Sequence, residues 1–365
     1  MTTTVNNEQK KLNVPNLRFK EFQGEWEMCK FKDVCSTSTG NKNTQDKIDD
    51  GIYPFYVRSQ TVERINSWTF DGEAILTAGD GVGVGKVFHH TYGKIGVHQR
   101  VYILSNFKCD ANYLFHFFSS HFYNRVKRMS AKNSVDSVRK EMITEMPLYL
   151  PSKQEQTKIG VLLSLLDERI STQNKIIDKL QSLIKGIRND VFGKLRKNIG
   201  FNAVVGDVLD YEQPQLYIVE DTEYTNEGTP VLTANKAFVL GYTLETDGIY
   251  DKGDCIIFDD FTLDCKYVDF PFKVKSSAIK ILTAKNKELL RYTFEFLKYL
   301  DLSTEEHKRH YIAETQNQEI ILPTEQMVKT IAHIFSTLSL QMETAVRQRN
   351  VFEKQKQYLL RQMFI

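Results

Sequence analysis

LPSKQEQTKIGVLLSLL, the stretch from Leu150 to Leu166, returns later in the chain as LPTEQMVKTIAHIFSTL, from Leu322 to Leu338. The offset between the copies is 322 − 150 = 172, and without a gap it also pairs Phe192 with Phe364. An internal repeat of this length describes the architecture of the whole chain. The order globule, long helix, globule, long helix predicts an α+β fold in which two α/β domains are separated by two long helices.

Both copies of the repeat carry apolar residues at alternating spacings of three and four, which is the a/d seam of a coiled coil. The first seam consists of Ile159, Leu163, Leu166, Ile170, Ile177, Leu180, Ile184, Ile187 and Val191, with the polar Gln173 in line. The second seam consists of Ile331, Phe335, Leu338, Met342, Ala345, Phe352, Leu359 and Met363, with Arg349 and Lys356 at two core positions.

A seam of this kind is compatible with burial against the helix's own domain. A helix of roughly 40 residues is about 60 Å long, however, which is more than one small domain covers. We therefore expect the two helices to bury their seams against each other as an antiparallel coiled coil. Ser152 and Glu155 predict a capping box at the start of the first helix.

The domain boundaries follow from the repeat. The first domain contains short β-rich runs, a glycine-rich turn from Ala78 to Lys86 and an aromatic helix. The second domain repeats this order, since Phe294 and Phe296 match Phe115 and Phe117. The predicted divisions are a flexible arm (1–13), a first domain (14–150), a central long helix (151–197), a second domain (198–322) and a C-terminal long helix (323–365).

Composition places the chain among ordinary globular proteins. Its 365 residues are 41% hydrophobic and 12% aromatic, which argues against disorder, and its net charge of +2 favours no partner. No uncharged apolar run is long enough to span a bilayer and the N-terminal residues include no apolar segment, so we expect neither a membrane span nor a signal peptide. The five cysteines form no CxxC pair, which favours reduced thiols in a cytoplasm over a zinc site.

Motifs of common enzymes are absent from the sequence. The glycine-rich segment from Gly79 to Lys86 has Asp80 where a Walker loop needs glycine, and Val87 where it needs serine or threonine. A hairpin that lets the backbone approach something closely is the better interpretation. No Asn-Pro-Pro-Tyr-like tetrapeptide of an amino-methyltransferase occurs, and His89, His90 and His98 have no carboxylate or cysteine at ligand spacing. We therefore expect a non-catalytic chain.

Two motifs carry a family resemblance. The N-terminal segment Val14-Pro15-Asn16-Leu17-Arg18-Phe19, followed by Trp26, resembles the usual start of a target-recognition domain in specificity subunits of type I restriction-modification systems. The run from Leu150 to Ile159, Leu-Pro-Ser-x-x-Glu-Gln-x-Lys-Ile, resembles the central conserved helix of that family. The second copy departs from the pattern, because its Glu325-Gln326 pair falls earlier and its domain lacks a counterpart of the N-terminal segment.

The resemblance implies a DNA-specificity subunit whose two target-recognition domains each read one half of a bipartite, asymmetric site in double-stranded DNA. The helices would space the half-sites and dock two methylation subunits and the restriction subunits. S-adenosylmethionine, ATP and Mg would bind those partners, and this chain would bind no cofactor. Amide, hydroxyl and guanidinium groups suit base edges and lysines suit phosphates. The expected DNA contacts are Arg58, Ser59, Gln60, Lys86, Gln99, Arg100, Lys132, Ser134, Ser137 and Arg139 in the first domain, and Asn235, Lys236, Lys273, Lys275, Ser276 and Ser277 in the second.

Alternatives remain open at this stage. Solvent exposure alone explains any one of these polar residues equally well, including the basic cluster between Arg125 and Lys140. A coiled-coil adaptor that binds only proteins would have negligible DNA affinity, and a self-sufficient nuclease or methyltransferase would modify DNA unaided. If the helices act as a ruler of about 60 Å, the half-sites lie no more than roughly 18 base pairs apart.

Overall fold

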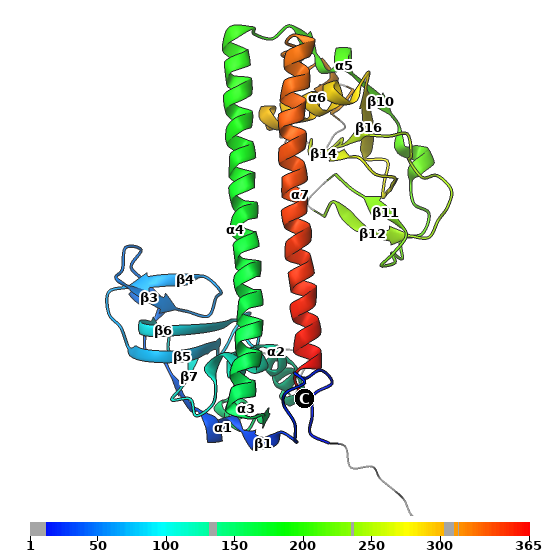
Figure 1. Ribbon diagram of the computed structural model, residues 1–365. Helices are drawn as coiled ribbons and strands as arrows, with labels where there is room; N and C mark the ends of the chain where they lie inside the picture. Colours follow the sequence, from blue (N-terminus) through cyan, green and yellow to red (C-terminus); the bar gives the residue numbers. More distant parts are fainter. Residues whose placement is uncertain (1–11, 131–136, 235–236, 303–309, 313) are drawn as a thin grey trace, which may run out of the picture. The chain divides into compact units, whose positions relative to one another are not determined.

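The computed structural model describes residues 12–130, 137–234, 237–302, 310–312 and 314–365 (Figure 1). The chain divides into two compact units. Unit 1 comprises residues 1–173 together with 348–365, and unit 2 comprises residues 174–347. No helix in the described part of the chain is long and apolar enough to cross a bilayer.

Two long helices contribute to both units. Helix α4 (Lys153–Asn198) and helix α7 (Glu325–Gln362) begin at the offset of the sequence repeat, 325 − 153 = 172. Unit 1 contains the first part of α4 and the last part of α7, whereas unit 2 contains the last part of α4 and the first part of α7. Within each unit the two helical segments run antiparallel (Figure 1).

Unit 1 is built on a six-stranded sheet with the order β2-β7-β5-β6-β3-β4. All neighbouring strands are antiparallel except β3 and β6, which run parallel. A separate antiparallel pair, β1 and β8, brings the two ends of the domain together. The elements of unit 1 that precede α4 are β1 (Glu27–Lys30), α1 (Phe31–Val34), β2 (Ser36–Thr39), η1 (Thr44–Asp46), β3 (Tyr53–Tyr56), β4 (Val62–Ile65), β5 (Phe70–Ala78), β6 (Phe88–Val97), β7 (Val101–Ser105), α2 (Ala111–Met129), α3 (Lys140–Thr144) and β8 (Pro147–Leu150).

Unit 2 repeats this topology in a divided form. One sheet has the order β10-β16-β13-β14 and a second has the order β12-β11-β15, in which β11 and β15 run parallel as β3 and β6 do. The pair β9 and β17 corresponds to β1 and β8. The elements between the long helices are β9 (Ala203–Val204), α5 (Val205–Val208), β10 (Leu209–Glu212), η2 (Pro214–Tyr217), β11 (Thr229–Leu232), β12 (Val239–Thr243), β13 (Cys255–Asp259), β14 (Cys265–Val268), β15 (Lys273–Val274), β16 (Ile279–Ala284), α6 (Lys287–Leu300), η3 (Thr315–Asn317) and β17 (Glu319–Ile320).

The same aromatic group closes the core of each unit. In unit 1 the ring of Phe364 lies 5.3 Å from that of Tyr113 and 5.5 Å from that of Phe117. In unit 2 the ring of Phe192 lies 5.5 Å from that of Tyr292 and 5.1 Å from that of Phe296. Burial of such a side chain stabilises a fold by roughly 2–3 kcal/mol. Helix α6 therefore packs against the C-terminal part of α4, and α2 packs against Phe364, which follows the end of α7.

All the seam residues predicted from the sequence are buried or half-buried. Their partners are not only the other long helix, because Ile159 and Leu163 belong to the core of unit 1, and Phe335 belongs to that of unit 2. Two of the three polar seam positions are paired between the helices within unit 1, whereas Arg349 donates to Asn350 of its own helix. Gln173 Nε2 donates to Gln348 Oε1 at 3.1 Å, and the ammonium of Lys356 contacts the carboxylate of Asp167.

The predicted capping box forms only in part. The backbone N–H of Glu155 donates to Ser152 Oγ at 3.4 Å, as expected. The carboxylate of Glu155 does not return to the start of the helix but accepts from Arg18, with distances of 2.8 Å from Nε and 2.7 Å from Nη2. The Glu155 side chain is fully buried there. Its role is therefore to hold the N-terminal segment against α4, a pairing that local sequence spacing could not reveal.

Candidate nucleic-acid interface

Three loops of unit 1 meet beside the ends of β3, β5 and β6. They are the loop after β3 (57–61), the glycine-rich loop between β5 and β6 (79–87) and the turn between β6 and β7 (98–100). Backbone hydrogen bonds join them: Gly79 N–H donates to the Arg100 carbonyl at 2.7 Å, and His98 N–H donates to the Tyr56 carbonyl at 3.0 Å. Val138 N–H donates to the Gly79 carbonyl at 2.7 Å, which brings the segment starting at residue 137 to the same place.

The glycines of the 79–87 loop allow this close approach. A Cβ atom on Gly83 would lie 2.3 Å from the carbonyl oxygen of Arg58, a distance that no side chain tolerates. Gly85 adopts a φ of 65° and lies against Tyr123 of α2, where a Cβ would be 2.9 Å from the ring. The sequence predicted that the backbone of this loop approaches a neighbouring group closely. In the structure those neighbours are the loop that carries Arg58 and the helix α2.

Charged side chains gather on this surface, which we call the three-loop surface (residues 58–60, 80–86, 99–100 and 137). Asp80 accepts from Arg58 Nη1 at 2.8 Å, and its other oxygen lies 3.7 Å from Arg100 Nε. The arginine side chains are 45% and 66% exposed, so both reach solvent. The ammonium of Lys86 lies 5.5 Å from the centre of the Tyr123 ring. Asp80 was not among the predicted contacts, and the only sequence signal for it is an acid within a glycine-rich turn.

A buried histidine supports the turn that carries Arg100. His98 Nδ1 accepts from the backbone N–H of Arg100 at 3.0 Å. Burial lowers the pKa of His98, and the nearby charge of Arg58 lowers it further. An unprotonated Nδ1 is required for this acceptor role, and both influences favour it. The adjoining Gln99 donates from Nε2 to Asn43 Oδ1 at 2.6 Å.

The remaining predicted contacts of unit 1 divide into three groups. Ser59 and Gln60 are exposed on the three-loop surface, and so is Ser137, which forms a β-bridge with Asp80. Arg139 is exposed at the start of α3. Lys132 and Ser134 lie outside the described residues.

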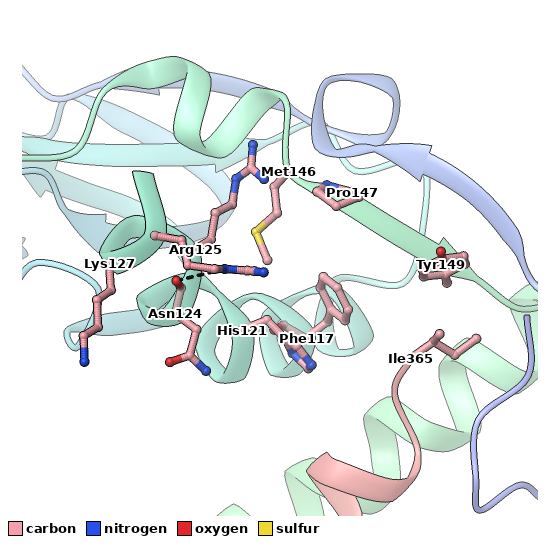
Figure 2. A pocket seen from close by; sticks show the side chains of 10 residues that line it. Phe117, His121, Asn124, Arg125, Lys127, Met146, Pro147, Tyr149 and Ile365 are labelled. Carbon is pink, nitrogen blue, oxygen red and sulfur yellow. Dashed lines mark hydrogen bonds between the residues drawn. The ribbon is translucent and has the colours of Figure 1, made fainter. Parts of the chain in front are cut away.

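The basic stretch that contains these residues also serves the fold. Arg125 donates from Nε to the Met142 carbonyl at 2.7 Å and from Nη2 to the Glu145 carbonyl at 2.9 Å, so it fastens α3 to α2. Beside it lies a pocket of about 510 Å³ with Phe117 and His121 at its apolar side (Figure 2). The rings of Phe117 and His121 stack 4.5 Å apart, and burial lowers the pKa of His121.

Fewer of the DNA contacts predicted for unit 2 lie on its described surface. Asn235 and Lys236 lie outside the described residues. Lys275, Ser276 and Ser277 occupy the loop between β15 and β16, where Lys275 N–H donates to the Leu232 carbonyl at the end of β11 at 3.1 Å. This position corresponds to the meeting of β3 with the turn after β6 in unit 1.

Lys273 does not fit a DNA contact. Its side chain is only 4% exposed, and its ammonium lies 2.7 Å from a carboxylate oxygen of Glu245. The ammonium also donates to the Asp247 carbonyl at 2.7 Å. The lysine is thus paired inside unit 2, where both side chains of β15, an edge strand of its sheet, are buried. The sequence prediction missed this because it treated Lys273 and Lys275 alike.

Among the described residues, no group of three or more His, Cys, Asp or Glu side chains is placed to hold a metal ion. The cysteines in the structure are free thiols, and burial raises the pKa of Cys35 and of Cys109 to about 12. These thiols are protonated at neutral pH and are poor nucleophiles.

Residues 23–182 match the family model described as the type I restriction modification DNA specificity domain. The specificity subunit of the type I restriction enzyme EcoR124I/EcoR124II of Escherichia coli is 46% identical over 126 residues, which are 33% of this chain and 31% of that protein. The specificity subunit of the Escherichia coli type I restriction enzyme EcoDI is 26% identical over 167 residues, which are 46% of this chain and 37% of that protein. The matched segments thus span about a third of these relatives.

The fold has a solved counterpart. The S subunit of a type I restriction-modification system from M. genitalium superposes with a TM-score of 0.75, covering 96% of this chain and 99% of that one. The sequence identity is 15%, so this likeness concerns the fold alone. It confirms the predicted α+β architecture of two domains and two long helices.

Proposed function

We propose that the chain is the DNA-specificity subunit of a type I restriction-modification complex, because residues 23–182 match the model of the type I restriction modification DNA specificity domain. Unit 1 reads one half of a bipartite site in double-stranded DNA and unit 2 reads the other. The observation that carries the proposal is the three-loop surface, on which Arg58, Lys86 and Arg100 are gathered by loops that glycines bring into contact.

The chemistry of this surface suits groove recognition. Guanidinium and amide groups can form two hydrogen bonds with one base edge, and a lysine neutralises the charge of a phosphate. Arg58, Gln99 and Arg100 supply the first kind of group and Lys86 the second. The repeated topology of unit 2 supports a second reading surface, which includes Lys275 beside the end of β11.

The long helices carry the second part of the proposal, which is the docking of two methylation subunits and of restriction subunits. Val161, Leu165 and Leu183 of α4 are each about half exposed although they are apolar. Val161 and Leu165 lie one helical turn apart and form an exposed apolar pair, which suits contact with a partner subunit. In this proposal S-adenosylmethionine, ATP and Mg bind the partner subunits, and this chain performs no chemical step.

Methylome sequencing tests the proposal directly. DNA from cells that express the full chain with its cognate methylation subunit should contain a bipartite methylated motif that disappears when this chain is omitted. An assembled complex that methylates no motif would contradict the DNA-specificity function and favour a protein-binding adaptor. Methylation or cleavage of DNA by the purified chain alone would contradict the assignment as a non-catalytic subunit.

A further inference from the structure

The structure assigns Asp80 a positioning role: we propose that Asp80 holds Arg58 and Arg100 as a guanine-reading pair, so that the half-site of unit 1 contains a G·C base pair. This inference rests on the proposed function and deepens it, because it names a base and the residues that read it. Guanine presents two acceptors, N7 and O6, in the major groove, and a bidentate arginine is their commonest partner.

Asp80 engages only one edge of each guanidinium. Its Oδ1 binds Nη1 of Arg58, and its Oδ2 faces Nε of Arg100. Within the described residues, no hydrogen bond to another residue occupies Nη2 of Arg58 or either Nη atom of Arg100. Each arginine therefore keeps a pair of adjacent N–H donors that can address two acceptors together.

The backbone around the pair is fixed from both sides. The 79–87 loop passes so close to Arg58 that Gly83 admits no side chain. The turn that carries Arg100 is held through its N–H by His98 and through its carbonyl by Gly79. Because its backbone is fixed and its Nη1 donates to Asp80, Arg58 loses less conformational entropy on binding, which favours directional recognition of a base.

The charge balance argues against a phosphate clamp. Two arginines and one aspartate carry a net charge of +1, so the aspartate cancels half of the attraction for phosphate. A surface built only to neutralise the DNA backbone gains nothing from such a carboxylate. Lys86, whose ammonium rests over the Tyr123 ring without a carboxylate partner among the described residues, is better suited to that task.

The first test compares variants of the full chain, each expressed with its methylation subunit, by methylome sequencing. Arg58→Ala and Arg58→Lys should both relax one G·C position of one half-site by about 5- to 150-fold in preference, since lysine keeps the charge but loses the bidentate geometry. Asp80→Asn should relax the same position, and the other half-site should not change. The matched control, Lys86→Ala, should lower methylation of all sites without altering the motif.

Either of two results would overturn the inference. An unchanged motif in Arg58→Lys would make Arg58 a phosphate contact. An unchanged motif in Asp80→Asn would remove the positioning role of Asp80. Both results presuppose a bipartite motif for the unaltered chain, so they leave the proposed function intact, whereas the lack of any motif contradicts the proposed function itself.

A second test begins with the unaltered chain and changes the DNA. The assembled complex binds a duplex whose guanine is replaced by deazaguanine, in which carbon replaces N7 and base pairing is kept. Loss of one acceptor should weaken binding by about 5- to 150-fold, and Arg58→Ala should add little to that loss because both changes remove the same contact. Equal affinity for the two duplexes, or fully additive effects, would refute guanine reading by Arg58.

Discussion

Removal of Arg18 is predicted to destabilise unit 1 by about 3 kcal/mol. The Glu155 carboxylate is completely buried, and both of its oxygens accept from the Arg18 guanidinium, which is itself 17% exposed. Breaking a buried ion pair from one side costs about 3–5 kcal/mol, because the remaining charge stays buried without a partner. We expect the lower end of that range because Arg18 lies at the surface and its removal admits water.

The assay follows thermal unfolding by tryptophan fluorescence. Both tryptophans of the chain, Trp26 and Trp68, belong to unit 1, and Trp26 is buried in its core. The signal therefore reports unit 1 even if unit 2 unfolds separately. A loss of about 3 kcal/mol corresponds to a decrease in the midpoint of roughly 6–12 °C for a domain of this size.

A double-mutant cycle identifies the cause. Arg18→Ala together with Glu155→Ala should be more stable than Arg18→Ala alone, because the second change removes the stranded carboxylate. The control is Glu21→Ala in the same unit, whose partner Lys158 on α4 is exposed, and it should leave the midpoint unchanged. A midpoint for Arg18→Ala equal to that of the parent chain, or a double variant no better than the single one, would refute the reasoning.

Three further predictions concern other parts of the chain. Burial lowers the pKa of His116 to about 3 from 6.5, so the unfolded state binds a proton that the folded state does not. This difference should lower the stability by on the order of 2 kcal/mol from pH 6.5 to pH 5. His116→Gln should reduce the pH dependence of the tryptophan-monitored midpoint by that amount and leave the part due to His98 and His121. Lys273→Ala should lower the free energy of unfolding of unit 2 by about 3 kcal/mol in urea titrations. An unchanged free energy of unfolding, together with a weaker dependence of DNA affinity on salt concentration, would instead indicate that Lys273 contacts DNA. Deletion of one heptad from both α4 and α7 should shorten the spacer of the methylated motif by about 10 Å, or roughly 3 base pairs; an unchanged spacer would contradict a ruler function.

The repeat and the seams could be predicted because each depends on spacing within one stretch of sequence. Phe192 and Phe364 occupy equivalent places in the two cores, as the constant offset between the copies indicated. Lys356 at a core position was unexplained by the sequence, since its partner Asp167 lies 189 residues away on α4.

The contacts of the candidate site were less predictable, for a physical reason. The sequence does not show whether a lysine faces solvent or pairs with an acid inside a domain. The prediction therefore did not separate the buried Lys273 from the exposed Lys275. The role of Asp80 depends on two arginines from other loops. The DNA contacts themselves stay predictions, because residue type alone does not set the direction of a side chain.

The two departures of the second helix from the family pattern have a common explanation. Glu155 at the start of α4 is buried because Arg18 binds it. The second domain has no counterpart of the segment that carries Arg18, and Glu325 at the start of α7 is correspondingly 77% exposed. At the offset of 172 the position equivalent to Glu155 is Met327, which is 39% exposed, so the second helix has no buried carboxylate there that needs an arginine.

The division of the long helices between the units has a consequence for biosynthesis. Unit 2 is one continuous stretch, residues 174–347, and it is translated before residues 348–365 of unit 1. Unit 1 needs Met363 and Phe364 in its core although it starts with the first part of the chain. Unit 1 is therefore translated first but completed last. Until Phe364 packs against it, the aromatic face of α2 remains exposed, where chaperones can bind it and aggregation can start.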